Sequence, residues 1–122
     1  MNINCINVLA LAYLGDAVYE VYIREKLINK GINNVDKLQT ESVKYVSAKG
    51  QANILDKLID NNFLSDEEIE IVKRGRNYKR SSHPKNTDII TYKCSTGFEA
   101  LIGYLYLTNK DRLNEILNQI DV

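Results

Sequence analysis

The 122-residue sequence has little proline, little cysteine and no excess of charge of either sign. Proline occurs once, at Pro84, and glycine six times; this scarcity disfavours an all-β sandwich with many turns and suits helices. Sixteen Lys and Arg residues balance sixteen Asp and Glu residues, so the net charge indicates no particular partner. The length fits one domain, residues 1–122, with a single core.

The two cysteines, Cys5 and Cys94, have no zinc-site spacing with each other or with the single histidine, so we expect reduced core thiols. No basic segment precedes the first apolar run. Asp16 and Glu20 interrupt that run before the roughly 18 residues of a membrane span. We therefore expect neither a signal peptide nor a membrane segment, and a cytoplasmic protein.

The spacing of apolar residues predicts an all-α fold, a compact helical bundle. Ser47 marks one helix start, and Ser65 with Glu68 three residues later forms a capping-box pattern at another. Asn61 and Asn62 interrupt the pattern between these helices. The predicted helices cover about residues 4–29, 34–46, 47–60, 66–77, 91–107 and 112–120.

Two of these helices have apolar positions that we expect to face the core. They are Val35, Leu38, Val43 and Val46, and Phe98, Leu101, Ile102 and Leu105. A turn is predicted at 108–111, and the polar segment 79–87, which holds the only proline, is predicted to be a mobile loop.

One carboxylate, Asp16, interrupts the apolar and small residues of the stretch 9–22. Aspartate is unfavourable inside a helix and is rarely buried unpaired, so this position needs a metal, a hydrogen-bonded partner or contact with water. Gly15 costs the helix about 1 kcal/mol relative to alanine, but its missing side chain lets another element approach the carboxylate. The stretch is therefore a candidate site.

A second carboxylate, Glu99, lies in the similar stretch 95–107, with Gly103 one turn later. Two such helices that pack through their glycine-bearing faces would bring Asp16 and Glu99 together. Mg²⁺ commonly binds one or two carboxylates with water and phosphate oxygens, and such a site suits phosphodiester cleavage because the metal activates water and stabilises charge on the phosphate. Each carboxylate is also compatible with an exposed helix surface or with a Lys or Tyr partner.

The segment 73–85, KRGRNYKRSSHPK, carries six Lys or Arg residues and no acid, although the whole chain is balanced. A basic run of this kind is suited to phosphates. A solvated helix end is the alternative, because the helix dipole favours basic residues there. The candidate binding residues are Lys73, Arg74, Arg76, Asn77, Lys79, Arg80, Lys85, Asn86 and Thr87.

Several polar residues near these segments have simpler explanations. Glu20 lies one turn after Asp16 and could reach the same metal through water, but we favour an ion pair with Arg24, four residues later. Thr87 or Asp88 is expected to cap the following helix, although both could contact a substrate. Core or interface positions are expected for Tyr13, Tyr19, Tyr22, Tyr104 and Tyr106.

Several separated segments, in matching order and spacing, resemble the ribonuclease III family and within it the Mini-ribonuclease III branch. These segments are LAYLGDAVYEVYIREKL, VSAKGQANIL, KRGRN, PKNTD and STGFEALIGYLYL, and they span essentially the whole chain. By this resemblance Asp16 matches the catalytic aspartate and Glu99 the metal-binding glutamate. Full-length relatives have two more carboxylates, where this chain has Ala12 and Thr96, and the Mini branch is similar in lacking them.

The resemblance implies a Mg²⁺-dependent endoribonuclease that cuts double-stranded RNA as a homodimer, leaving 5′-phosphate and 3′-hydroxyl ends. Its expected substrate is precursor 23S ribosomal RNA, presented with a ribosomal protein bound. Because double-stranded RNA shows proteins its shape and phosphates rather than its bases, the basic segment would supply positioning. The main alternative is a non-catalytic dimeric module that binds structured RNA, which the missing carboxylates at Ala12 and Thr96 favour. A purely structural helical protein is a third possibility.

Overall fold

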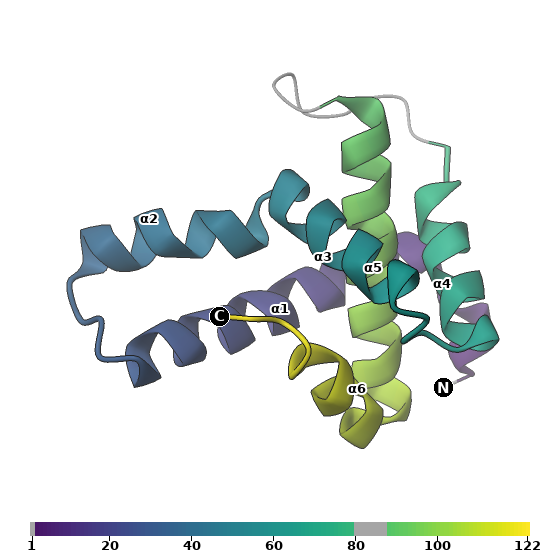
Figure 1. Ribbon diagram of the computed structural model, residues 1–122. Helices are drawn as coiled ribbons and strands as arrows, with labels where there is room; N and C mark the ends of the chain where they lie inside the picture. Colours follow the sequence, from purple (N-terminus) through teal and green to yellow (C-terminus); the bar gives the residue numbers. More distant parts are fainter. Residues whose placement is uncertain (1, 80–87) are drawn as a thin grey trace.

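The computed structural model describes residues 2–79 and 88–122, and its regular elements are all helices, which confirms the predicted all-α class (Figure 1). In chain order the described elements are the 3₁₀ helix η1 (Ile3–Cys5) and the α-helices α1 (Val8–Asn29), α2 (Val35–Val46), α3 (Ala48–Asp60), α4 (Asp66–Arg76), α5 (Ile89–Thr108) and α6 (Lys110–Leu117). Among the described residues, every helix is too short or too polar to cross a membrane. The predicted mobile loop, residues 79–87, lies outside the described residues except for Lys79.

The central element is α5, because α1, α3, α4 and α6 all pack against it (Figure 1). α1 runs past α5, and its C-terminal half forms with α2 an arm that projects from the rest of the molecule. Gly31, with φ of 96°, lies between these two helices and takes a backbone conformation that favours glycine. The contact between α1 and α5 brings together the two candidate stretches, 9–22 and 95–107.

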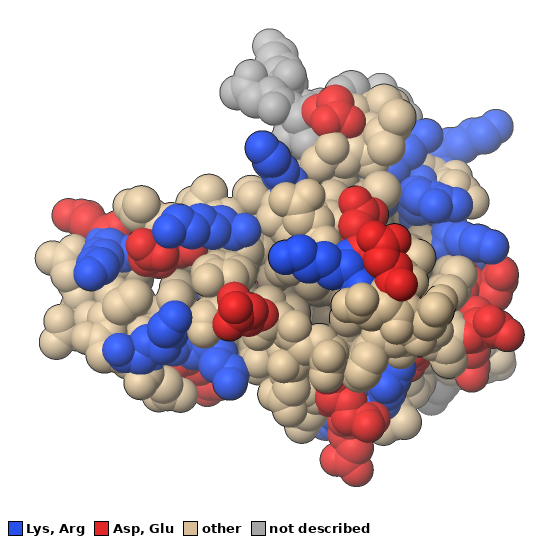
Figure 2. Space-filling model, in the orientation of Figure 1, with Lys and Arg blue, Asp and Glu red and all other residues tan. Residues whose placement is uncertain are grey.

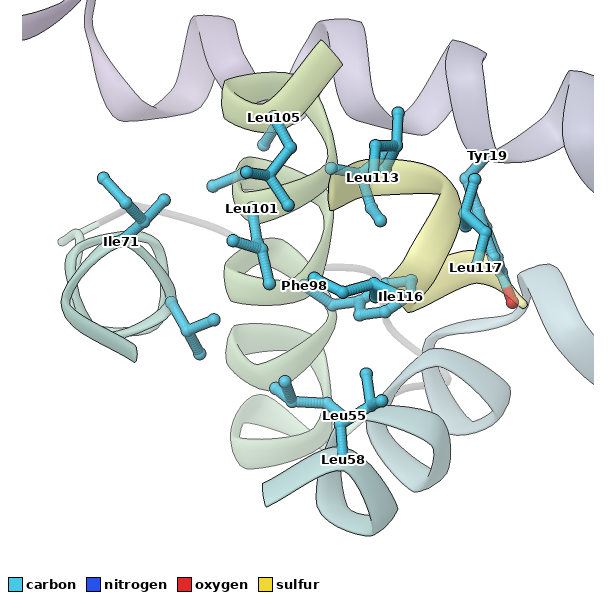
Figure 3. Packing of buried hydrophobic residues seen from close by; sticks show 14 of the residues in the cluster. Tyr19, Leu55, Leu58, Ile71, Phe98, Leu101, Leu105, Leu113, Ile116 and Leu117 are labelled. Atoms are coloured by element: carbon cyan, nitrogen blue, oxygen red, sulfur yellow. The ribbon is translucent and has the colours of Figure 1, made fainter. Parts of the chain in front are cut away.

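The core lies around α5 and ties α1 to α2. Tyr19 of α1 and Phe98 of α5 are fully buried, and their rings meet edge to face with centroids 5.1 Å apart. The Tyr19 hydroxyl donates to the Tyr45 carbonyl at 2.9 Å, near the end of α2. The core residues labelled in Figure 3 also include Leu55, Leu58, Ile71, Leu101, Leu105, Leu113, Ile116 and Leu117. The inward positions predicted for the second half of the chain, Phe98, Leu101, Ile102 and Leu105, are confirmed.

The predicted helix caps are confirmed where the sequence signals were strong. The Ser47 side chain caps α3. Ser65 and Glu68 form a complete capping box at the start of α4, with each side chain accepting from the backbone N–H of the other. Asp88 caps α5, which begins at Ile89, two residues before the predicted start.

Three predicted boundaries are wrong. The first helix begins at Val8, later than predicted, because the Asn7 side chain accepts a hydrogen bond from a backbone N–H of the first turn and caps α1 there. The predicted turn at 108–111 is reduced to Asn109, whose side chain caps the next helix directly. That helix ends at Leu117 instead of near residue 120.

Some positions predicted to be buried are exposed instead. Val35 is 70% and Val43 55% exposed because α2 lies in the arm, and of its four predicted inward positions only Leu38 and Val46 pack against the core cluster. Cys5, predicted to be a core thiol, is exposed in η1, whereas the other cysteine is partly buried against the core. Among the described elements α2 contacts only α1 and α3, so its apolar face is covered in part and the sequence pattern overstated how much of it is buried.

Candidate active site

Asp16 and Glu99 come together because α1 and α5 cross through their glycines, as the sequence predicted. A Cβ atom on Gly15 would collide with the backbone carbonyl of Glu99, and one on Gly103 would collide with the carbonyl of Leu11. Such backbone-to-backbone approach is possible only without these side chains. The two carboxyl groups lie close enough across the crossing for a protonated Glu99 to donate a side-chain hydrogen bond to Asp16.

The two carboxylates line one surface pocket of about 280 Å³, whose walls are Leu9, Ala12, Tyr13, Asp16, Thr96 and Glu99. Ala12 brings no polar group, and the Thr96 hydroxyl donates to the Tyr92 carbonyl at 3.1 Å. Asp16 is exposed, Glu99 is only partly exposed, and Tyr13 at the rim is 84% exposed. The pocket therefore offers two carboxylates, and neither Ala12 nor Thr96 adds a charged ligand to it.

The electrostatics of the pocket disfavour a second negative charge. Burial raises the pKa of Glu99 to about 8, and the hydrogen bond and negative charge of Asp16 act in the same direction. Glu20 adds a smaller contribution of the same sign, while a hydrogen bond from Gln51 opposes the shift. The predicted ion pair of Glu20 with Arg24 is confirmed at 3.3 Å.

The site fits a hydrated divalent cation with hard oxygen ligands. In the part of the chain that the structure describes, no group of three or more His, Cys, Asp or Glu side chains is placed to hold a metal ion, so Asp16 and Glu99 would be the protein carboxylates. Mg²⁺ commonly binds through one or two carboxylates and keeps several waters. A cation between the two side chains would also relieve the repulsion that raises the pKa of Glu99.

The sequence analysis missed Gln51, which contacts Glu99 from α3. Its Nε2 donates to Glu99 Oε2 at 3.3 Å and to the Val46 carbonyl at 3.1 Å, and the side chain is 2% exposed. Its Oε1 has no hydrogen-bond partner among the described residues, which costs about 1–3 kcal/mol for a buried acceptor. A signal was available, because Gln51 shares the inward face of α3 with Leu55 and Leu58 at helical spacing.

The described part of the basic segment lies on and just after α4, where Figure 2 shows Lys and Arg side chains gathered at the right of the molecule. A Cβ atom on Gly75 would lie 3.1 Å from the carbonyl oxygen of Thr96, so this end of α4 packs against α5 one turn before Glu99. The candidate residues Lys73, Arg74, Asn77 and Lys79 are exposed, and Arg76 is partly buried. The other candidates, Arg80, Lys85, Asn86 and Thr87, lie outside the described residues.

Known proteins similar to this chain indicate its family. The family model of the ribonuclease III domain matches residues 9–110. Mini-ribonuclease 3 of Streptococcus pneumoniae is 47% identical over 119 residues, 97% of this chain and 93% of that protein. Mini-ribonuclease 3 of Brevibacillus brevis is 50% identical over 117 residues, which cover 95% and 86% of the two chains.

Similarity extends to a solved structure. A crystal structure of a Fusobacterium nucleatum protein matches with a TM-score of 0.83 and 36% sequence identity, covering 96% of this chain and 93% of that one. The similar structure thus covers nearly the whole chain, including the residues 9–110 that match the family model. The chain therefore belongs to the ribonuclease III family, and its enzymatic class is endoribonuclease.

Proposed function

We propose that this endoribonuclease cleaves double-stranded RNA with Mg²⁺ held by Asp16 and Glu99. The observation that carries the proposal is the pairing of two carboxylates in one open pocket, where burial and mutual repulsion raise the pKa of Glu99 to about 8. Carboxylates kept only for stability would pair with a base, as Glu68 does with Arg112, whereas none of the ion pairs among the described residues involves Asp16 or Glu99. Membership of the ribonuclease III family supports the same substrate class.

Asp16 and Glu99 would supply the negative charge that binds the ion, and Asp16, being exposed, would face the RNA backbone. When bound, Mg²⁺ supplies positive charge that polarises the scissile phosphate and the attacking water. The water oxygen attacks phosphorus and the bond to the 3′ oxygen breaks, so the products carry a 5′-phosphate and a 3′-hydroxyl. Ala12 and Thr96 bring no charged group to the pocket, so water would supply remaining ligands of the ion.

The basic segment would hold the RNA duplex near this pocket. Its described residues, Lys73, Arg74, Arg76, Asn77 and Lys79, lie on a helix end that packs against α5 next to Thr96. Charge contacts of this kind bind phosphates of any sequence and weaken as salt rises. We therefore assign positioning of RNA to this segment, together with Arg80, Lys85, Asn86 and Thr87.

A homodimer would place one site on each strand of the duplex. Two antiparallel strands are related by a pseudo-two-fold axis, which a two-fold protein dimer can match with one self-complementary interface. The exposed apolar side chains along α1 and α2 support such an interface: Tyr13 is 84%, Val21 57%, Ile28 56% and Val35 70% exposed. We assign the natural substrate to precursor 23S ribosomal RNA, with a ribosomal protein bound to it, on the resemblance to the Mini-ribonuclease III branch.

Cleavage of a long RNA duplex by the wild type and by Asp16→Asn tests the proposal. Assays contain Mg²⁺ or a chelator, and the strand ends are read on a gel. We expect the wild type to cut only with Mg²⁺, and Asp16→Asn to bind the duplex but cut it at least ~10³-fold more slowly, because it keeps the size and loses the charge.

Two other outcomes would be informative. Cutting by Asp16→Asn at the wild-type rate would show that the site is misassigned. Binding without cutting by both proteins, even with precursor ribosomal RNA and its ribosomal protein, would favour the RNA-binding module, which the uncharged walls at Ala12 and Thr96 make the second candidate.

A further inference from the structure

Gln51 is a buried polar side chain that has no role in the chemistry described so far. It is the fourth residue of α3 and faces the core with 2% exposure. Its amide nitrogen bridges two oxygens, the Val46 carbonyl at 3.1 Å and Glu99 Oε2 at 3.3 Å. Its own oxygen has no hydrogen-bond partner among residues 2–79 and 88–122.

The orientation of this amide follows from its two neighbours. Both are acceptors, so only the nitrogen can face them, and a turned amide would set Oε1 against two oxygens. In this orientation both amide protons point at the oxygens of Val46 and Glu99, and the buried Oε1 of Gln51 is left without a partner among the described residues. An apolar side chain of similar length would fill this space without an unpaired oxygen, so the packing alone does not account for a glutamine.

The Val46 carbonyl, the other acceptor of Gln51, belongs to a backbone segment that makes close contacts with its neighbours. A Cβ atom on Gly50 would collide with the Lys44 carbonyl, so α3 starts in close contact with the last turn of α2. One residue before Val46, the Tyr45 carbonyl accepts from the buried Tyr19 hydroxyl at 2.9 Å. The α2–α3 junction, defined here as residues 44–50, is therefore anchored on α1 as well, three residues after Asp16.

We propose that Gln51 is a positioning residue that holds the Glu99 carboxylate in its metal-binding orientation against the α2–α3 junction. By occupying one oxygen of Glu99 from the core side, it leaves the carboxylate turned toward Asp16 and the pocket. The inference rests on the proposed function, in which Glu99 is a Mg²⁺ ligand. Side chains that orient metal ligands in this way contribute roughly 10–100-fold to metal affinity.

The test is Gln51→Met, which keeps the length and removes both amide donors. In calorimetric Mg²⁺ titrations we expect the Kd to rise about 10–100-fold. At low Mg²⁺ kcat should fall with the KM for RNA unchanged, and saturating Mg²⁺ should restore kcat. Tm should stay within about 3 °C of the wild type, because the loss of the unpaired Oε1 offsets the donor lost by Val46.

Two further variants keep the inference testable. Gln51→Asn retains the amide but is one methylene too short to bridge both oxygens, so it should show the same loss of affinity. Adding Gln51→Met to Glu99→Gln should weaken Mg²⁺ binding no further, because Gln51 acts through Glu99. A full additional loss in the double variant would overturn the inference.

Tyr19→Phe is the matched control, since it removes a different hydrogen bond to the same junction. We expect it to lower Tm while the Mg²⁺ Kd stays within about twofold. A lower Tm with unchanged Kd in Gln51→Met, or an equal loss of affinity in Tyr19→Phe, would overturn the role assigned to Gln51. Failure of the wild type to bind Mg²⁺, or equal binding by Asp16→Asn, would instead overturn the proposed function.

Discussion

Two partly or fully buried glutamates of this protein lie in opposite surroundings. Glu68, 6% exposed, receives hydrogen bonds from Arg112 Nε at 2.8 Å and Nη2 at 2.9 Å, and from the Ser65 N–H at 2.9 Å. The Arg112 hydrogen bonds, with the Ser65 N–H, hold the pKa of Glu68 below its usual range. Glu99 instead faces Asp16, and its pKa is raised to about 8.

The difference separates a structural carboxylate from one available for chemistry. Glu68 joins the start of α4 to α6 through Arg112, and its charge is compensated. The charge of Glu99 is opposed by its neighbour and supported by one amide from Gln51. Burial of a carboxylate therefore does not by itself indicate a candidate site in this fold. Glu99 is the candidate because it forms no ion pair among the described residues and lines an open pocket.

The largest effect on stability is expected from Arg112→Met, which leaves Glu68 buried without its base. Loss of one partner from a buried pair costs about 3 kcal/mol, and Arg112 also donates to the Phe63 carbonyl at 2.6 Å. Urea unfolding measures this loss. Arg24→Met, which removes only the exposed pair with Glu20, is the control and should change the free energy of unfolding by less than about 0.5 kcal/mol. Equal losses of unfolding free energy in Arg112→Met and Arg24→Met would contradict the difference between the buried and the exposed ion pair.

Glu99→Gln should act in the opposite direction and stabilise the metal-free protein. A glutamine can accept from Gln51 and donate to Asp16 at every pH, whereas Glu99 can donate to Asp16 only while it is protonated, so the gain is ~2 kcal/mol at pH 8. Thermal unfolding without metal measures the gain. Saturating Mg²⁺ should raise the Tm of the wild type more than that of Glu99→Gln, which binds the ion more weakly. A lower Tm for Glu99→Gln would show that the negative charge of Glu99 is compensated after all.

The pH dependence of stability should separate the two glutamates without any loss of packing. The contribution of Glu99 is fully present below its ordinary pKa of 4.5 and is lost as the pH rises through about 8. The contribution of Glu68, whose pKa is lowered, is present above 4.5 and is lost as the pH falls through its folded value.

Urea unfolding of the metal-free protein at a series of pH values checks this pattern. Glu99→Gln should abolish the alkaline decline, and Arg112→Met should flatten the acid decline. An alkaline decline that persists in Glu99→Gln would place the responsible group elsewhere.

The smallest effect is expected from Glu20→Gln. Glu20 is paired with Arg24 and contributes least among the groups that raise the pKa of Glu99. We expect stability to change by less than about 0.5 kcal/mol, and the Mg²⁺ Kd by less than about threefold. Calorimetric Mg²⁺ titrations of Glu20→Gln and Glu99→Gln, run side by side, compare the two losses of affinity. A loss of affinity as large as that of Glu99→Gln would make Glu20 a metal-binding residue instead of an ion-pair partner.

Local signals in the sequence predicted the helices well where a single turn decides the structure. The capping box at Ser65 and the cap at Ser47 depend on residues within one turn, and both are present as predicted. Val35 and Val43 were assigned to the core wrongly, because periodicity shows that a helix has an apolar face but not whether a neighbour covers it. The α1–α2 arm leaves that face exposed.

The spacing of apolar residues was enough to predict the helical class. Asp16, Glu99 and the glycines that let their helices touch could be recognised as well, because each is a local departure from the pattern of a buried helix. The position of Gln51 beneath Glu99 could not be predicted, since this contact joins residues 48 positions apart and depends on the packing of α3 against α5. Folding also places Arg112 beside Glu68 and Asp16 beside Glu99, so that only the charge of Glu68 is compensated by a base. Helix propensity acts within a turn, whereas the charge that a glutamate experiences depends on side chains that only folding brings to it.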